Sequence, residues 1–231
     1  MQFKRLELLV GNKIEDIKNK TVLIVGIGGV GGYALEAIVR SGVGKVIIVD
    51  NDTIDITNLN RQIISLHENI GKYKVDVAQN RALDINPNCI IIKHRTFLNK
   101  DNTQELFKEH IDYIIDACDT IEVKKELIRQ AIKNGSNIIS SMGTGNKMHP
   151  EKLEIIEINK TEYDPIAKII RKMVRDERIK KKIFVIASKE KPIKTNTNII
   201  ASNSFVPATA GLMAASYVIN DIVGELDDKR N

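Results

Sequence analysis

The sequence is poor in cysteine, and this scarcity excludes two classes of protein. Its 231 residues include two cysteines, Cys89 and Cys118, and neither belongs to a Cys-x-x-Cys pair. A secreted fold held by disulfides needs a framework of several cysteines, so a reducing compartment is expected. A zinc site built from four cysteines is excluded as well, and we expect no zinc. The histidines are few and scattered, at His67, His94, His110 and His149.

Long uninterrupted apolar runs are also missing. The N-terminal segment has no apolar core of the kind that a secretion signal carries. The longest apolar stretch, residues 205–223, is interrupted by Pro207, Asn220 and Asp221, whereas a membrane span needs about 20 nearly uninterrupted apolar residues. Tryptophan is absent, and hydrophobic residues make up 42% of the chain, which is typical of an ordinary α/β protein. We expect a cytoplasmic protein without a membrane partner.

Positive charge is present in excess and is concentrated in one part of the chain. The formal net charge is +5, and Lys and Arg far outnumber Asp and Glu between residues 168 and 194. A local basic block attracts polyanions, because neutralised phosphates release counterions. A solvated, lysine-rich surface would give the same composition. The basic block alone leaves both interpretations open.

Short apolar runs alternate with helical stretches along most of the chain. Runs such as TVLIV and KVIIV are typical of buried parallel strands. Their alternation with helices predicts an α/β fold, with a Rossmann-like, mostly parallel sheet and helices on both faces. The expected strands are 21–25, 45–49, 90–93, 113–116, 137–140 and 183–187. The expected helices are 33–41, 71–83, 101–110, 121–134, 164–182 and 208–223.

A glycine-rich turn stands between the first expected strand and the helix that follows it. Its glycines are Gly26, Gly28, Gly29 and Gly31. Glycines allow a tight turn and a close approach of the backbone to a phosphate, and the helix N-terminus adds free N–H groups. Asp50 ends the next strand, where an acid can bond a ribose hydroxyl. On these residues alone, an NAD-dependent dehydrogenase is the first candidate.

A dense polar set after Asp50 turns the prediction from NAD to ATP. It comprises Asp52, Asn58, Arg61 and Lys74. A triphosphate needs such groups, because Arg offers a planar fork of donors and Lys a compact charge to the β- and γ-phosphates. Asp119 lies just past the carboxyl end of another strand, where a carboxylate can hold Mg²⁺ against the phosphates. ATP and Mg²⁺ are therefore the expected cofactors, with Asp119 as the metal ligand.

The chain shows no repeat and no linker that would divide it. We expect a single domain over residues 1–231, with a nucleotide-binding core at about 20–145. An elaborated C-terminal half, at about 146–225, would lie on the substrate side. Within it, residues 189–203 are polar and are expected to form a mobile loop, and the sequence leaves open whether this loop closes over substrate.

The motifs GxGGxG, DxD, NxxRQ, GxxK and DxxD occur here in this order. The order resembles the adenylating domain of the ubiquitin-activating enzyme superfamily, which includes adenylyltransferases for sulfur carriers. The resemblance covers roughly residues 3–145. It implies that a carboxylate attacks ATP, which yields an acyl-adenylate and pyrophosphate.

The same resemblance implies residue roles. Asp50 would bind the ribose, the phosphates would be bound by Asn58, Arg61 and Lys74, and Asp119 would bind the metal. Arg5 matches an arginine that reaches the ATP of the partner subunit, so a homodimer is implied. Arg5, Arg61, Lys74 and Asp119 are the residues expected to act in catalysis.

Residues 141–150 and 202–211 are similar to signatures of the tRNA threonylcarbamoyladenosine dehydratases. This similarity extends from residue 3 to about residue 224, although His149 stands where Asp is expected before Pro150. It implies ATP-dependent dehydration of N6-threonylcarbamoyladenosine in tRNA. The carboxylate would be activated as an acyl-adenylate, and an internal nucleophile would then displace AMP and close a ring.

A tRNA substrate gives the basic block a use, since phosphate contacts position a nucleic acid. The residues expected to face substrate are Gly143, Gly145, Asn146, Lys147, Arg171, Lys172 and Arg175. Tyr163 and Pro165, beside the basic helix, can support base stacking. Cys118 can touch nucleotide or accept sulfur from a cysteine desulfurase partner, although a buried packing cysteine is commoner.

Two alternatives to a tRNA-modifying enzyme stay open. The first is an adenylyltransferase that activates the C-terminal Gly-Gly of a ubiquitin-like sulfur carrier. Such enzymes usually carry two Cys-x-x-Cys pairs, which this chain lacks. The second is a noncatalytic nucleotide-binding module, which would bind ATP without releasing pyrophosphate. Dependence on a monovalent cation is a further open possibility.

Overall fold

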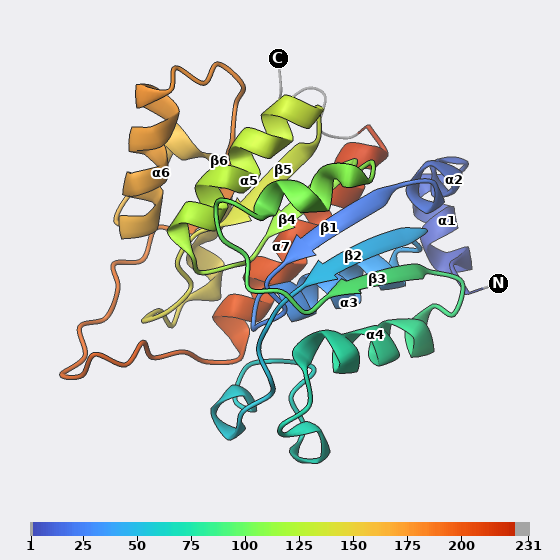
Figure 1. Ribbon diagram of the computed structural model, residues 1–231, viewed down its shortest axis with the longest axis horizontal. Coiled ribbons are helices and arrows are strands. Elements are labelled where there is room, and N and C mark those ends of the chain that lie inside the picture. The colour runs from blue at the N-terminus through green and yellow to red at the C-terminus, as the bar shows by residue number, and fades with distance from the viewer. Residues whose placement is uncertain (1, 225–231) are drawn as a thin grey trace.

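The computed structural model describes residues 2–224, which form a seven-stranded sheet covered by helices on both faces (Figure 1). The strands are β1 (Thr21–Val25), β2 (Lys45–Val49), β3 (Ile90–His94), β4 (Tyr113–Asp116), β5 (Asn137–Ser141), β6 (Leu153–Glu157) and β7 (Phe184–Ser188). The helices are α1 (Lys4–Val10), α2 (Lys13–Lys18), α3 (Gly31–Arg40), α4 (Lys74–Ile85), α5 (Ile121–Asn134), α6 (Pro165–Asp176) and α7 (Phe205–Ile222). Short 3₁₀ helices are η1 (Ile56–Asn58), η2 (His67–Asn69), η3 (Thr103–Lys108), η4 (Pro150–Lys152) and η5 (Ile158–Lys160).

The strand order is β3-β2-β1-β4-β5-β7-β6. All neighbours in this order pair in parallel except β6 and β7, which are antiparallel. The prediction of a Rossmann-like, mostly parallel sheet is confirmed. The chain reverses its direction of travel across the sheet between β1 and β4, and open α/β sheets bind ligands in the crevice at such a switch point.

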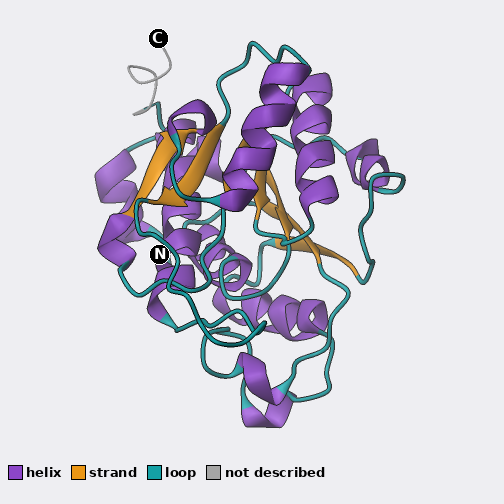
Figure 2. Cartoon of the chain, turned by 90° about the vertical axis from the view of Figure 1, so that its left-hand side faces the viewer, coloured by secondary structure: helices purple, strands orange, loops and turns teal. Residues whose placement is uncertain are grey.

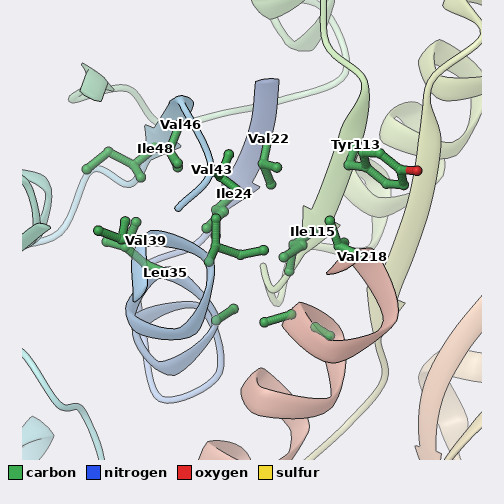
Figure 3. Packing of buried hydrophobic residues seen from close by; sticks show 14 of the residues in the cluster. Val22, Ile24, Leu35, Val39, Val43, Val46, Ile48, Tyr113, Ile115 and Val218 are labelled. Carbon is green, nitrogen blue, oxygen red and sulfur yellow. The ribbon is translucent and has the colours of Figure 1, made fainter. Parts of the chain in front are cut away.

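Alternate residues of the central strand face the two helical layers. Val22 and Ile24 of β1 belong to the apolar cluster under α3 and α7, and Figure 3 shows them pointing toward these helices. Leu23 and Val25 belong to the opposite cluster, together with residues of α5 and α6. Figure 2 shows helices on both sides of the twisted strands. A strand buried on both faces explains why the sequence of β1 is apolar throughout.

The sheet is continuous from the predicted nucleotide-binding core into the C-terminal half. β5 pairs with β7 through Ile139–Phe184, Ser140–Val185 and Ser141–Ile186. The division near residue 145 stays a prediction, and residue 225, its expected far limit, lies outside the described residues. Within residues 2–224, no helix is both long and apolar enough to cross a bilayer. The cytoplasmic location stays an expectation.

Two local predictions differ from the structure. The helix expected at 101–110 is a 3₁₀ helix, Thr103–Lys108. Side chains compete for the backbone just before it, where Asn99 accepts from the amide of Asp101 at 2.8 Å, and such bonds disfavour an α-helix. The basic helix expected to reach residue 182 ends at Asp176. No prediction was made for the two N-terminal helices α1 and α2, which are short.

Candidate nucleotide-binding site

A cavity of about 520 Å³ opens at the carboxyl ends of β1, β2 and β4. Nine of the predicted nucleotide-binding residues line it: Gly26, Gly28, Gly29, Asp50, Asp52, Asn58, Arg61, Lys74 and Asp119. They come from segments that are far apart in the sequence and meet because parallel strands bring their carboxyl ends to one edge. The cavity is large enough for a nucleotide and lies where the fold predicts a ligand.

The glycine-rich turn is fixed by close backbone packing. Gly26 has a φ of +86°, and a Cβ there would lie 2.7 Å from the carbonyl oxygen of Ala117. Gly31 does not line the cavity. A Cβ on it would lie 1.8 Å from the carbonyl oxygen of Gly26, so this glycine lets α3 begin directly against the turn. The free N–H groups at the start of α3 can then meet a phosphate.

Asp50 is held in place from both sides. One carboxylate oxygen accepts from the amide of Ile27 at 2.7 Å, and the other accepts from the amide of Asp52 at 2.8 Å. Burial raises the pKa of Asp50, against the opposing effect of the charge on Lys74. Each oxygen has a second lone pair, so the fixed carboxylate can accept from ribose hydroxyls.

The expected phosphate ligands have partners within the protein. The ammonium group of Lys74, a residue that is 5% exposed, lies 2.7 Å from a carboxylate oxygen of Asp52. Arg61 donates to the carbonyl oxygen of Thr57 at 2.8 Å. The side-chain oxygen of Asn58 accepts from a backbone amide. All three side chains border the cavity, so a nucleotide's phosphates can compete for their donors.

A buried ion pair supports the far wall of the cavity. The ammonium group of Lys124 lies 3.1 Å from both carboxylate oxygens of Asp116 and donates to the carbonyl oxygen of Ser141 at 2.8 Å. Lys124 is 1% exposed and Asp116 is fully buried. Burial opposes the charge on Lys124, but the attraction of Asp116 outweighs this effect and raises the pKa of Lys124. The pair ties β4, α5 and β5 together behind the turn that carries Asp119.

Asp119 itself is exposed, and its carboxylate accepts from the hydroxyl of Thr120 at 3.4 Å. Within residues 2–224 there is no group of three or more His, Cys, Asp or Glu side chains that could hold a metal ion by themselves. A single carboxylate suits Mg²⁺ that is bound mainly by the phosphates of a nucleotide and by water. Asp119 fits this arrangement.

Cys118 lines the cavity, and its sulfur lies 3.1 Å from a carboxylate oxygen of Asp116. Burial and then the negative charge of Asp116 raise the pKa of Cys118 well above the ordinary thiol value. The thiolate is the reactive form of cysteine. The neutral thiol favoured here suits contact with nucleotide better than acceptance of sulfur.

The turn at residues 143–147 packs against the 189–203 loop. Asn146, at a φ of +58°, donates its amide to the carbonyl oxygen of Ala201 at 2.7 Å. A Cβ on Gly145 would lie 2.2 Å from a methyl carbon of Ile200. Thr144 and Ser202 both line the cavity. The two segments therefore form one wall of the site.

Lys147 is turned into the protein. It is 4% exposed, donates to the carbonyl oxygen of Gly143 at 2.5 Å and lies 3.5 Å from Asp164. Asp164 also accepts from the amide of Gly143 at 2.9 Å. Lys147 therefore stabilises the turn, and the contact with substrate expected of it stays a prediction.

The basic residues of α6 divide into two groups. Lys172 and Arg175 are exposed, although Arg175 lies 3.3 Å from the neighbouring Asp176. Arg171 instead donates to the carbonyl oxygen of Thr161 at 2.6 Å and braces the turn before α6. The two exposed residues are available to a polyanion, whereas Arg171 is committed to the fold.

Arg5 does not line the cavity. It is exposed on α1, and Figure 1 shows α1 beyond the amino ends of β1 and β2, away from their carboxyl ends. Arg5 is therefore separated from the site that its own chain forms.

Several residues of the site were not assigned from the sequence. Gln62, Phe97, Thr144 and Ser202 line the cavity. Gln62 belongs to the NxxRQ motif, whereas Phe97 carries no local signal because it lies in an irregular segment. Lys124 had a usable signal, since helical spacing places it on the same face as the apolar Leu127 and Ile128.

The switch-point cavity, the glycine-rich turn and the fixed Asp50 define a nucleotide-binding protein of the doubly wound α/β class. The chain belongs to the ThiF family, whose model matches residues 2–229. A tRNA threonylcarbamoyladenosine dehydratase of Bacillus subtilis is 40% identical over 99% of this chain and 97% of the relative. A tRNA N6-threonylcarbamoyladenosine dehydratase of Escherichia coli, solved in complex with ATP, matches with a TM-score of 0.91. Its identity is 28%, and the match covers 99% of this chain and 96% of that chain.

Proposed function

We propose that this protein binds ATP in the switch-point cavity and dehydrates N6-threonylcarbamoyladenosine in tRNA. A carboxylate oxygen of the threonylcarbamoyl group attacks the α-phosphorus of ATP, and pyrophosphate leaves. An internal nucleophile of the substrate then attacks the acyl carbon, AMP leaves, and a ring closes with net loss of one water. The proposal rests mainly on one observation: the residues expected to bind ATP line a single cavity. The chain that forms this cavity matches the Bacillus subtilis dehydratase over nearly its whole length.

Chain residues supply positioning and charge in this proposal. Asp50 holds the ribose, and the N–H groups at the start of α3 meet the phosphates. Arg61 and Lys74 bind the phosphates and stabilise the negative charge of the leaving pyrophosphate. Lys74 is already paired with Asp52. When nucleotide binds, its ammonium group would contact both Asp52 and a phosphate. Ring closure within one substrate needs correct positioning more than a protein nucleophile.

Mg²⁺ would neutralise charge on the phosphates when bound, with Asp119 as its protein ligand. The exposure of Asp119 at the rim supports this role, because Mg²⁺ keeps several waters when it binds through one carboxylate.

We propose that the active unit is a homodimer in which Arg5 reaches the cavity of the partner subunit. The position of α1 away from its own cavity supports this assembly (Figure 1). Leu8 and Leu9 of α1 are 75% and 83% exposed, and α1 has no buried residue. Exposed apolar side chains on such a helix favour a subunit contact.

The substrate proposal is tested by incubating the protein with ATP, Mg²⁺ and threonylcarbamoylated tRNA and weighing the nucleosides after digestion. The expected result is loss of one water from the modified adenosine, with AMP formed. An unchanged nucleoside, with ATP–pyrophosphate exchange only in the presence of a carrier ending in Gly-Gly, would contradict the proposal in favour of the carrier adenylyltransferase. ATP binding without either reaction would contradict the proposal and indicate a noncatalytic nucleotide-binding module.

A further inference from the structure

The turn between η5 and α6 presents an exposed aromatic ring on an unfavourable backbone conformation. Tyr163 has a φ of +55° and is 52% exposed. Glycine or asparagine adopts this conformation at less cost than a residue with a bulky side chain. The turn itself would be more stable with glycine at this position, and the ring of Tyr163 does not fill the core. A strained backbone conformation kept at an exposed side chain points to a function of that side chain.

The residues on either side of Tyr163 are anchored. Thr161 is buried, its hydroxyl donates to the carbonyl oxygen of Ile158 at 2.7 Å, and its own carbonyl accepts from Arg171. Asp164 is 4% exposed and accepts from the amide of Ala167 at 2.9 Å, which fixes the start of α6. The ring is thus carried on a rigid base, although its exposure shows that it packs little against the protein.

A cation from a distant segment lies over this ring. The ammonium group of Lys191 is 5.1 Å from the ring centroid of Tyr163. Its neighbour Glu190 is 7% exposed and accepts from the amides of Met148 and His149, so the start of the 189–203 loop is anchored. Two acidic residues flank Tyr163 in the sequence, the exposed Glu162 and the buried Asp164. Aromatic rings that stack on bases, beside cations that meet phosphates, are how proteins bind single-stranded nucleic acid.

The segments that carry Tyr163 and Lys191 are both connected to the wall of the cavity. Asp164, next to Tyr163, accepts from the amide of Gly143 at 2.9 Å, and the following residue Thr144 lines the cavity. The loop that carries Lys191 reaches the cavity at Ser202. In Figure 1 this loop runs past the lower left of the molecule, below α6.

We propose that Tyr163 and Lys191 bind an unpaired nucleotide of the RNA substrate beside the adenosine that is activated in the cavity. The ring of Tyr163 stacks on the base and Lys191 contacts the phosphate. Arg171 is a positioning residue for the ring through Thr161. This inference rests on the proposed function, because it requires an RNA substrate.

The absence of tryptophan from the chain gives a direct test. Tyr163→Trp places a single indole at the site, and a stacked base is expected to quench its fluorescence. The probe is a threonylcarbamoylated anticodon stem-loop RNA, compared with a blunt duplex of the same stem. Tyr73→Trp is the matched control, because Tyr73 is 43% exposed and has Arg95 at 4.7 Å from its ring. Quenching by the stem-loop at position 163 alone supports the proposal. Equal quenching at both positions, quenching by both RNAs, or no quenching overturns it.

A second measurement separates binding from a structural role. Tyr163→Gly suits the positive φ, so the variant is expected to fold with an unchanged or higher melting temperature. Its KM for tRNA is expected to rise about 5- to 150-fold, the equivalent of one lost base stack. The affinity for ATP should stay at the wild-type value, and Tyr163→Phe, which keeps the ring, should restore the KM. An unchanged KM for tRNA in the glycine variant overturns the proposal.

Lys191→Met is expected to weaken RNA binding and to lower the slope of log affinity against log salt by about 1, the loss of one phosphate contact. An unchanged slope overturns the role of Lys191. Wild-type protein that fails to remove water from the modified adenosine would refute the proposed function. Wild-type activity without quenching of Trp at position 163 would refute this inference alone.

Discussion

Gly31 and Gly28 belong to the same turn but meet very different surroundings. A Cβ on Gly31 would lie 1.8 Å from the carbonyl oxygen of Gly26, whereas the nearest atom to a Cβ on Gly28 would be a side-chain nitrogen of Gln62, at 3.8 Å. Packing requires a glycine at position 31, while position 28 has room and faces the cavity. Substitution of Gly31 should therefore reduce stability, whereas substitution of Gly28 should affect the cavity.

Gly31→Ala is expected to lower the free energy of unfolding by about 1–3 kcal/mol, because backbone must move to admit the methyl group. Gly28→Ala is expected to keep the melting temperature and to weaken ATP binding, since the added methyl group borders the phosphate site. Thermal unfolding and calorimetric titration with ATP measure the two effects. Equal loss of stability in both variants would contradict this account.

Because Lys124 and Asp116 form a buried ion pair, substitution of Lys124 alone is expected to lower the free energy of unfolding strongly. Lys124→Met leaves Asp116 charged and unpaired in the core, which is expected to cost about 3–5 kcal/mol of the free energy of unfolding in urea titrations. Lys125→Met is the control, because Lys125 pairs with the exposed Glu122 at 2.7 Å and should cost about 0–1 kcal/mol. The double variant Asp116→Asn, Lys124→Met should recover part of the loss. A mild effect of Lys124→Met alone would be evidence against a buried charge on Asp116.

Cysteine reactivity provides a pH-dependent prediction. Burial, and then the charge of Asp116, raises the pKa of Cys118, and burial raises the pKa of Cys89 to about 11. Both thiols are therefore protonated at pH 8, where an ordinary thiol with a pKa near 8.5 is partly ionised. Alkylation by iodoacetamide at pH 8 should be much slower in the folded protein than in urea, as followed by mass spectrometry of peptides. Rapid modification of folded Cys118 at pH 8 would instead support a role in sulfur transfer.

At the scale of elements, helix ends depend on interactions that hydrophobic periodicity does not encode. α6 ends where Arg178 takes a φ of +54°. The amide of Ile179 then donates to the carbonyl oxygen of Val174 at 3.0 Å, and the amide of Arg178 donates to that of Arg175 at 3.1 Å. This is the Schellman arrangement, usually built around glycine. An arginine in that position gave no signal for the helix to stop.

The start of the 189–203 loop is held by Glu190, which predicts a loss of order at low pH. Burial raises the pKa of this carboxyl, but hydrogen bonds from the amides of His149 and Met148 outweigh burial, and the pKa is lowered overall. Because the folded pKa lies below the unfolded value, the ionised carboxylate stabilises the fold at neutral pH. This stabilisation is lost as the pH falls through the folded pKa.

Glu190→Gln is expected to cost about 1–3 kcal/mol at pH 7, because one carboxylate oxygen that accepts from an amide is replaced by a donor. Limited proteolysis should cut the 189–203 loop faster in this variant, and its stability should fall less between about pH 6 and about pH 3 than that of the wild type. Glu154→Gln is the control, since Glu154 pairs with the exposed Lys189 on the surface. Similar proteolysis rates in the two variants would contradict the anchoring role.

At the scale of the whole molecule, the position of Arg5 predicts complementation between subunits. Arg5→Ala and Asp119→Ala proteins should each be inactive. In a mixed dimer, one of the two sites combines the wild-type Asp119 of one subunit with the wild-type Arg5 of the other. Random exchange of equal amounts should therefore restore roughly a quarter of wild-type activity. No recovery after verified subunit exchange would mean that each site is built from one chain.

The sequence by itself determined the features that depend on local chemistry. The apolar runs of β1 and β2 exclude exposure on either face, so they predicted a buried parallel sheet. The glycines from Gly26 to Gly31, standing between a strand and a helix, predicted the phosphate-binding turn. Asp50 could be placed in the cavity as well, because the carboxyl end of a strand next to that turn has a known position.

Only the tertiary structure decided which charged side chains are exposed to solvent and which are buried against a partner within the protein. Lys147 and Lys172 are both lysines in basic or polar segments, yet Lys147 is buried beside Asp164 and Lys172 is exposed. Likewise, Lys124 and Lys125 are neighbours on α5, and only Lys124 faces Asp116. The physical reason is that the state of a charge depends on partners from distant segments, and packing alone brings these together.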